Sequence, residues 1–224
     1  MLSGLAGSLR AARLDRVARR LSPAVLARSE AMVRPDYPVR LQACVFAVLA
    51  VVMLATRTTA ATHVLHLPET SLASFFVLGY FVRRLAGFAT LFALAFAIDV
   101  AVVGAKGWMS FCLTPAYGML FPAYAMMWVA GRIGAARLEE SATDLMPALV
   151  LLTGATLSSQ ILSSGGFYFL SGRFPDASVA GFLPRLMTYF PYVLVATLGW
   201  TGVAAIAWGM VLGFHPSLRK RPVR

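Results

Sequence analysis

Six apolar runs, separated by short polar segments, account for most of the sequence. They cover residues 39–56, 71–82, 85–103, 116–130, 145–162 and 182–212. A helix of about 20 apolar residues crosses a hydrocarbon core of about 30 Å. The pattern therefore predicts an all-α integral membrane protein with six transmembrane helices.

Two of these runs depart from the usual length of a span. At about 1.5 Å per residue, the second run covers only about 18 Å. We expect it to span only if its helix starts near Pro68 and continues into Arg83 and Arg84, whose long side chains can reach the interface. The sixth run is longer than a span requires, so Pro184 and Pro191 are expected to kink its outer end or leave that end as loop.

The charge distribution predicts the orientation of the spans. The chain is 59% hydrophobic and 13% charged, with a formal net charge of +11. With six spans and a cytoplasmic N-terminus, sixteen of the 20 lysines and arginines fall on the inner side, which is the bias typical of cytoplasmic loops. The positive charge thus predicts topology rather than nucleic-acid binding, and both termini are expected to be cytoplasmic.

The ends of the chain are basic. In residues 1–37, helical spacing places Leu14, Val17, Ala18 and Leu21 on one face and Arg13, Arg16 and Arg20 on another. This pattern is typical of a basic amphipathic helix on an anionic membrane surface; a solvated tail is the alternative. The sequence therefore divides into this N-terminal segment, a membrane domain over residues 38–214 and a basic cytoplasmic tail over residues 215–224.

The three loops expected on the outer side carry most of the chemically interesting residues. These loops are residues 58–70, 104–115 and 163–181. They contain His63, His66, Trp108, Phe111, Cys112, Phe167, Tyr168, Phe169 and Phe174, and Tyr117 and Tyr189 follow near the outer helix ends. Aromatic side chains with a few polar groups line small-molecule pockets, but Trp and Tyr also gather at membrane interfaces without a ligand. The composition alone leaves both interpretations open.

Cys112 is expected to be a lone thiol on the outer side. Cys44 lies near the inner end of the first run, a membrane core of about 30 Å away, whereas a disulfide needs Cα atoms within about 7 Å. As a thiolate, Cys112 would be a nucleophile and a soft metal ligand; otherwise it is a small packing residue.

The remaining ionisable residues give weaker signals. His63 and His66 are three residues apart, but two histidines alone do not make a metal site. Asp99 lies inside the third run, and an acid within a membrane span is a functional candidate. It is also close enough to the outer end to have a structural role, reaching water or a helix N-terminus.

Three segments give the chain a resemblance to a known family. They are residues 68–80, the string Phe111-Cys112-Leu113-Thr114-Pro115-Ala116-Tyr117, and residues 163–191. Together with six spans in about 200 residues, they resemble the substrate-binding S-components of energy-coupling-factor (ECF) transporters. Within these, they resemble the cobalamin-specific BtuM group, whose members are often solitary. The Cys-x-x-Pro-Ala-Tyr string is the most specific part.

The resemblance implies a function and a set of site residues. It implies that Cys112 coordinates the cobalt of cobalamin, that Tyr117 lines the pocket, and that His63 or His66 also belongs to the site. Trp108, Phe111 and Tyr168 are further candidates for contact with the ligand. The protein would then take up cobalamin or a related corrinoid across a bacterial inner membrane, and Cys112 would promote removal of the upper ligand, a decyanation.

The resemblance also implies a protein partner, and alternatives to it stay open. Ala43 and Ala47 form a small-x-x-x-small pair on the first span, which allows close helix approach and would suit an ECF coupling subunit. The alternatives are an S-component for another vitamin, a membrane thiol-redox enzyme that uses Cys112, and a structural subunit without a ligand.

Overall fold

The computed structural model describes residues 37–57, 69–105, 115–138 and 141–218. Contacts divide the chain into Met1–Pro35 with Val223–Arg224 and Asp36–Pro222, and all the described residues belong to the second unit. These residues form six α-helices, three short 3₁₀ helices and no strand. The α-helices are α3 (Val39–Arg57), α5 (Ser71–Phe81), α6 (Leu85–Ala105), α8 (Leu120–Arg137), α9 (Leu145–Leu170) and α10 (Val179–Phe214). The 3₁₀ helices are η1 (Pro115–Met119), η2 (Ala142–Asp144) and η3 (Pro216–Leu218).

Successive α-helices alternate in direction. At one end of the bundle, Arg57 at the end of α3 contacts Ser71 at the start of α5 and Asp99 near the end of α6. At the other end, Tyr37 packs on Phe81 at the end of α5 and on Trp208 late in α10. The first of these ends is the one that the charge pattern assigns to the outer side, and we refer to the two as the outer and inner ends.

Four of the helices are long and apolar enough to cross a membrane, namely α3, α6, α9 and α10. Their large apolar side chains are exposed along their length; Val195 and Ile206 of α10 are 70% and 66% exposed. Extensive apolar surface of this kind marks a membrane or protein contact rather than a face in water. The four helices indicate a multi-pass membrane protein, in agreement with the sequence pattern.

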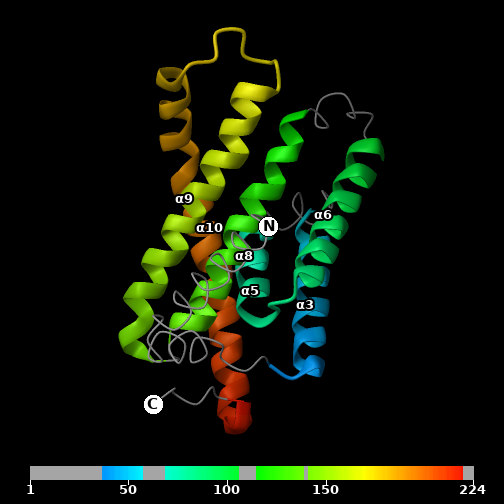
Figure 1. Cartoon of the computed structure of the whole chain (residues 1–224), viewed down its shortest axis with the longest axis vertical. Coiled ribbons are helices and arrows are strands. Elements are labelled where there is room, and N and C mark those ends of the chain that lie inside the picture. Colours follow the sequence, from blue (N-terminus) through cyan, green and yellow to red (C-terminus); the bar gives the residue numbers. More distant parts are fainter. Residues whose placement is uncertain (1–36, 58–68, 106–114, 139–140, 219–224) are drawn as a thin grey trace, which may run out of the picture. The chain divides into compact units, whose positions relative to one another are not determined.

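Helix α5 differs from the second span that the sequence predicted. It starts at Ser71, and Pro68 lies outside the described residues. It does not continue into Arg83 and Arg84, which precede α6 as non-helical backbone. Its 11 residues cover only about 17 Å. Nine of the 11 are buried, because α3, α6, α8, α9 and α10 all contact it (Figure 1). The helix is therefore an interior element enclosed by protein.

Two glycines allow α5 and α8 to touch through their backbones. A Cβ atom added at Gly79 would collide with the carbonyl oxygen of Trp128, and one added at Gly131 would collide with the carbonyl oxygen of Phe76. The Trp128 indole N–H also donates to the carbonyl of Val82, 3.2 Å away. This close packing fixes the central helix against its main neighbour.

The outer ends of α9 and α10 correct the prediction of a loop over residues 163–181. Helix α9 continues to Leu170 and ends where Gly172 adopts a left-handed conformation with φ of 71°, as at many helix C-termini. Helix α10 begins after Ser178, whose Oγ accepts from the Gly181 amide at 3.2 Å, and it contains both Pro184 and Pro191. The outer end of α10 is helical despite both prolines, so the loop is reduced to residues 171–178.

The Gly165-Gly166 pair in α9 serves packing rather than a turn. A Cβ atom at Gly166 would collide with the side chain of Met119 in η1, and one at Gly165 would touch the ring of Phe182 in α10. The two glycines therefore let η1 and α10 approach α9 closely.

Candidate functional site

A buried arginine joins four helices at the outer side of the bundle. Arg57 is the last residue of α3, and its side chain is only 6% exposed. Its five guanidinium N–H groups meet five acceptors, which we call the Arg57 network: the side chains of Asp99, Glu69, Ser71 and Tyr124 and the carbonyl of Ala95. The charge is thus satisfied, as a buried cation requires.

The carboxylate of Asp99 is the centre of the anionic half of this network. Its Oδ2 accepts from Arg57 Nη1 at 2.6 Å and from the Tyr117 hydroxyl, also at 2.6 Å. Asp99 keeps 24% of its side chain exposed and Glu69 keeps 64%. The network therefore carries two carboxylates against one guanidinium, and both carboxylates are more exposed than the guanidinium.

Tyr117 lies on η1, outside the four long apolar helices, and serves as a hydrogen-bond donor. Burial, followed by the hydrogen bond to Asp99, raises the pKa of its phenol above the ordinary value. The hydroxyl thus keeps its proton near neutral pH and donates it to the carboxylate. Phe96 packs edge-on against the Tyr117 ring with centroids 5.6 Å apart, which holds the ring beside α6.

Most of the site residues predicted from the sequence lie outside the described residues. These are His63, His66, Trp108, Phe111 and Cys112. Of the others, Tyr117 belongs to the Arg57 network and Tyr168 to a separate aromatic cluster with Phe182 and Leu186. No group of three His, Cys, Asp or Glu residues that could hold a metal ion occurs within the part of the chain that the structure describes.

Tyr168 lines a pocket of about 370 Å³ between α9 and α10. We call it the α9–α10 pocket; its lining consists of Gln160, Ser163, Ser164, Phe167, Tyr168, Phe174, Phe182, Arg185, Leu186 and Tyr189. Aromatic walls are combined here with an amide, two aliphatic hydroxyls and one guanidinium. This mixture of a mainly apolar surface with a few polar groups is what ligand pockets have.

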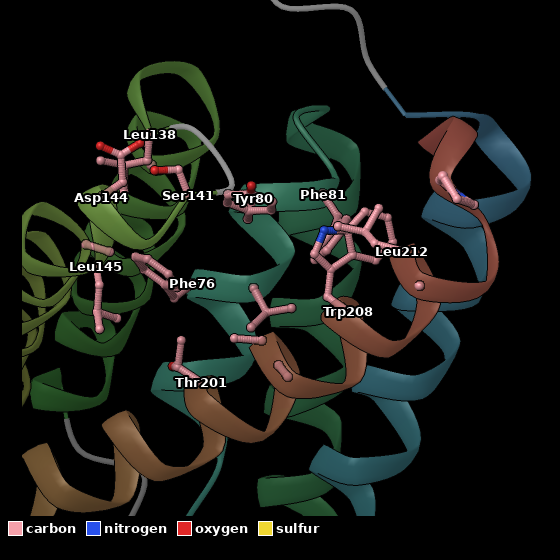
Figure 2. Close-up of a pocket in the computed structure, with 18 residues that line it drawn as sticks. Phe76, Tyr80, Phe81, Leu138, Ser141, Asp144, Leu145, Thr201, Trp208 and Leu212 are labelled. Carbon is pink, nitrogen blue, oxygen red and sulfur yellow. The ribbon is translucent and has the colours of Figure 1, made fainter. Parts of the chain in front are cut away.

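A larger hollow of about 760 Å³ opens at the inner end of the bundle. Figure 2 shows Phe81 of α5 beside Trp208 of α10, whereas Phe76 of α5 points toward Leu145 at the start of α9. Its lining is mostly apolar and contains none of the site residues predicted from the sequence. It is therefore distinct from both polar sites at the outer side.

Sequence reasoning missed the role of Arg57. It treated Arg57 only as a basic residue at the outer end of an apolar run, and it left Asp99 either as a functional candidate or as a structural residue that reaches water or a helix N-terminus. The signal was available, because an acid inside a span usually pairs with a base at a similar depth. Which base it would be could not be read from the sequence, since Arg57 and Asp99 are 42 residues apart.

Comparison of the chain with models of known protein families gives no match, and comparison with curated proteins gives no significant match either. The chemistry of the two outer sites therefore rests on their own residues. In the Arg57 network, the N–H groups of the guanidinium all have hydrogen-bond acceptors. The α9–α10 pocket offers hydrogen-bond donors beside aromatic rings.

Proposed function

We propose that this protein binds cobalamin or a related corrinoid at its outer side and mediates its uptake across a bacterial cytoplasmic membrane. In this proposal it is a solitary ECF-type S-component of six membrane helices, with Cys112 as ligand to the cobalt. The four long apolar helices support an activity within the membrane. The resemblance of the Cys-x-x-Pro-Ala-Tyr string to the BtuM group supplies the substrate class.

The hydrogen bond between Asp99 and Tyr117 is the observation that carries the proposal furthest. It ties η1 to α6 at 2.6 Å, and so it fixes where the chain resumes after residues 106–114. Pro115 follows Cys112 by three residues, so covalent geometry alone keeps the two Cα atoms within about 11 Å. Cys112 itself lies outside the described residues, so its place beside the corrin is part of the proposal.

The proposed chemistry is a ligand exchange on cobalt. The thiolate of Cys112 replaces the upper ligand of cyanocobalamin; a cobalt–sulfur bond forms, and cyanide leaves with its electron pair and takes a proton from water. No electron is transferred, and the cobalt stays trivalent. Tyr117, held in place by Asp99, would line the pocket beside the corrin, and His63 or His66 would contribute from the first outer loop.

The alternative to solitary transport is an exogenous ECF coupling subunit as protein partner, which would contact α3. Ala43 and Ala47 are both exposed, so the small-x-x-x-small face is available to another helix. Replacement of both by tryptophan should leave corrinoid binding unchanged and abolish co-purification with a coupling subunit. Loss of binding in this variant would instead show that α3 acts on the fold.

Visible absorption of the purified protein tests the corrinoid proposal. After incubation with cyanocobalamin and gel filtration, corrin should co-elute with a shifted spectrum, and free cyanide should appear in the eluate. Cys112→Ala should abolish the shift and the cyanide release, whereas Cys44→Ala, which removes the exposed free thiol of α3, should change neither.

Each other outcome has a definite meaning. Co-elution with an unshifted spectrum would keep the vitamin and remove the role of Cys112. Absence of corrin would overturn the corrinoid proposal and favour another vitamin as ligand. Turnover of a thiol substrate that Cys112→Ala loses, without corrin binding, would favour a membrane thiol-redox enzyme.

A further inference from the structure

Arg185 in the α9–α10 pocket is a cation that no described carboxylate neutralises. Its guanidinium carbon lies 4.6 Å from the ring centroid of Phe174 and 5.6 Å from that of Tyr168. Among residues 37–57, 69–105, 115–138 and 141–218, it makes no ion pair with an acid. Stacking on aromatic faces orients a guanidinium and leaves its N–H edge free for a planar acceptor.

The polar groups on the other side of the pocket are also donors. The Gln160 amide nitrogen donates to Ser164 Oγ at 2.7 Å, so the Ser164 hydroxyl acts there as an acceptor and its own proton remains available. The amide nitrogen of Gln160 has a second N–H, and Gln160 itself is buried. Arg185, Ser164 and Gln160 therefore provide donors that suit a ligand bearing several acceptor oxygens.

The rest of the lining is apolar and aromatic. Phe167, Phe174 and Phe182 are in the wall, and the Tyr168 and Phe174 ring centroids are 4.6 Å apart. The volume of about 370 Å³ lies in the usual range of small-molecule pockets, about 300–1,000 Å³. The lining therefore suits a ligand with an apolar portion, and a bare inorganic ion would leave most of it unfilled.

The distance along α9 places the pocket near the outer membrane interface if Leu145 marks the inner boundary of the span. Gln160 is about 22 Å and Tyr168 about 35 Å along the helix from Leu145. A hydrocarbon core is about 30 Å thick. The pocket is thus placed where a ligand from the outer solution or the headgroup of a lipid can enter.

We propose that the α9–α10 pocket binds an organic oxyanion, a phosphate or carboxylate group held by Arg185, Ser164 and Gln160, with its apolar portion against the phenylalanine rings. The inference goes beyond corrinoid uptake and stands without it. Two sources could supply the same chemistry: a water-soluble organic anion, or the phosphate of a membrane lipid.

Binding of phenyl phosphate to the purified full-length protein tests the proposal. The probe combines an oxyanion with an aromatic ring and contains no cobalt, so the result is independent of Cys112. Titration calorimetry in an uncharged maltoside detergent should show saturable binding, and phenol at the same concentrations should show none. Arg185→Gln should weaken binding at least about tenfold, which corresponds to about 1.4 kcal/mol. Arg185→Lys, which keeps the charge and loses the planar fork, should fall between the two.

A matched control separates a built site from general surface charge. Arg173→Gln removes another arginine at the same end of the bundle that does not line the pocket, and it should leave the affinity unchanged. Because Arg185 is exposed, its variants should keep the thermal stability of the parent. Equal affinity in Arg185→Gln and the parent, or equal loss in Arg173→Gln, would overturn the proposal.

Phospholipid nanodiscs distinguish the two sources. If the natural ligand is a soluble anion, phenyl phosphate should bind equally in detergent and in nanodiscs. If it is a lipid headgroup, binding should be seen in detergent and be suppressed in nanodiscs, and native mass spectrometry should retain phospholipid on the parent protein but not on Arg185→Gln. If phenyl phosphate does not bind in detergent and no phospholipid is retained on the parent protein, both the soluble-anion and the lipid versions of the proposal are wrong.

Discussion

Asp99 of α6 accepts hydrogen bonds from Arg57 of α3 and from Tyr117 of η1, each at 2.6 Å. A single carboxylate thus joins three elements, from a residue 42 positions before it to a residue 18 positions after it in the sequence. Because Arg57 also reaches α5 and α8, the Arg57 network fixes the relative positions of four α-helices at the outer side. The segment that carries the histidines follows Arg57 directly in the sequence, and the segment that carries Cys112 lies between α6 and η1.

Removal of one partner of the ion pair should destabilise the protein strongly. Arg57→Gln leaves Asp99 without its cation, and Asp99→Asn leaves Arg57 poorly neutralised in a buried position. Breaking a buried pair on one side typically costs about 3–5 kcal/mol, and the partial exposure of Asp99 places the expected loss near about 3 kcal/mol. Unfolding in detergent with denaturant, followed by circular dichroism, measures it.

Two companion variants check the reason for this loss. The double replacement Arg57→Met with Asp99→Leu should recover much of the stability, because apolar residues of similar volume can replace a buried pair. Glu69→Gln should cost less than about 1 kcal/mol, as expected for an exposed pair. A double variant less stable than either single one would contradict the ion-pair explanation.

The close contact between α5 and α8 should not tolerate a methyl group. Gly79→Ala and Gly131→Ala each place a Cβ atom against a backbone carbonyl of the other helix, which cannot move without separating the helices. We expect a loss of about 2 kcal/mol or more, comparable to overpacking of a core, measured as a lower melting temperature in detergent.

Gly154→Ala is the matched control for these variants. It is also a helical glycine, and a Cβ atom there would have no atom within 4 Å apart from its chain neighbours and its own helix backbone. Alanine should therefore be neutral or slightly stabilising at this position, since it is the better helix former. If all three substitutions behaved alike, the α5–α8 contact would not be close.

Tyr117 should make stability depend on pH only under alkaline conditions. The pKa of its phenol is raised in the folded protein, so its contribution is present in full below the unfolded pKa of about 10 and is lost as the pH rises through the folded pKa. The difference in unfolding free energy between the parent and Tyr117→Phe should be constant from pH 6 to 9, at about 1–2 kcal/mol, and shrink above about pH 10. A difference that grows with pH would show that Tyr117 is not the donor.

Ser159 offers a stabilising substitution. Its side chain is completely buried, and its Oγ has no hydrogen-bond partner among the described residues. Since burial of an unpaired hydroxyl costs about 1–3 kcal/mol, Ser159→Ala should raise the unfolding free energy by about 1 kcal/mol. Ser163→Ala is the comparison, because its Oγ donates to the Ser159 carbonyl at 3.0 Å, and this change should not stabilise. Destabilisation by Ser159→Ala would indicate that the hydroxyl is bonded.

The sequence by itself determined the class of the protein and the order of its helices. Long apolar runs must form helices that satisfy their own backbone in lipid, so periodicity and length suffice for α3, α6 and α9. Local chemistry was less informative at helix ends. The sequence predicted a loop over residues 163–181, but α9 and α10 extend into this region, where Gly166 and Gly165 pack against Met119 and Phe182.

The tertiary structure alone decided which polar groups meet. The contacts of Arg57 with Asp99 and Tyr124 join residues 42 and 67 positions apart, and no local pattern specifies such pairs. The same holds for α5, whose short length indicated a doubtful span, whereas its burial among five helices gives it an interior place. Local hydrophobicity depends on residues that are neighbours in the sequence, so it can be read from the sequence. Charge pairing and close helix packing depend on distances that only the folded bundle sets.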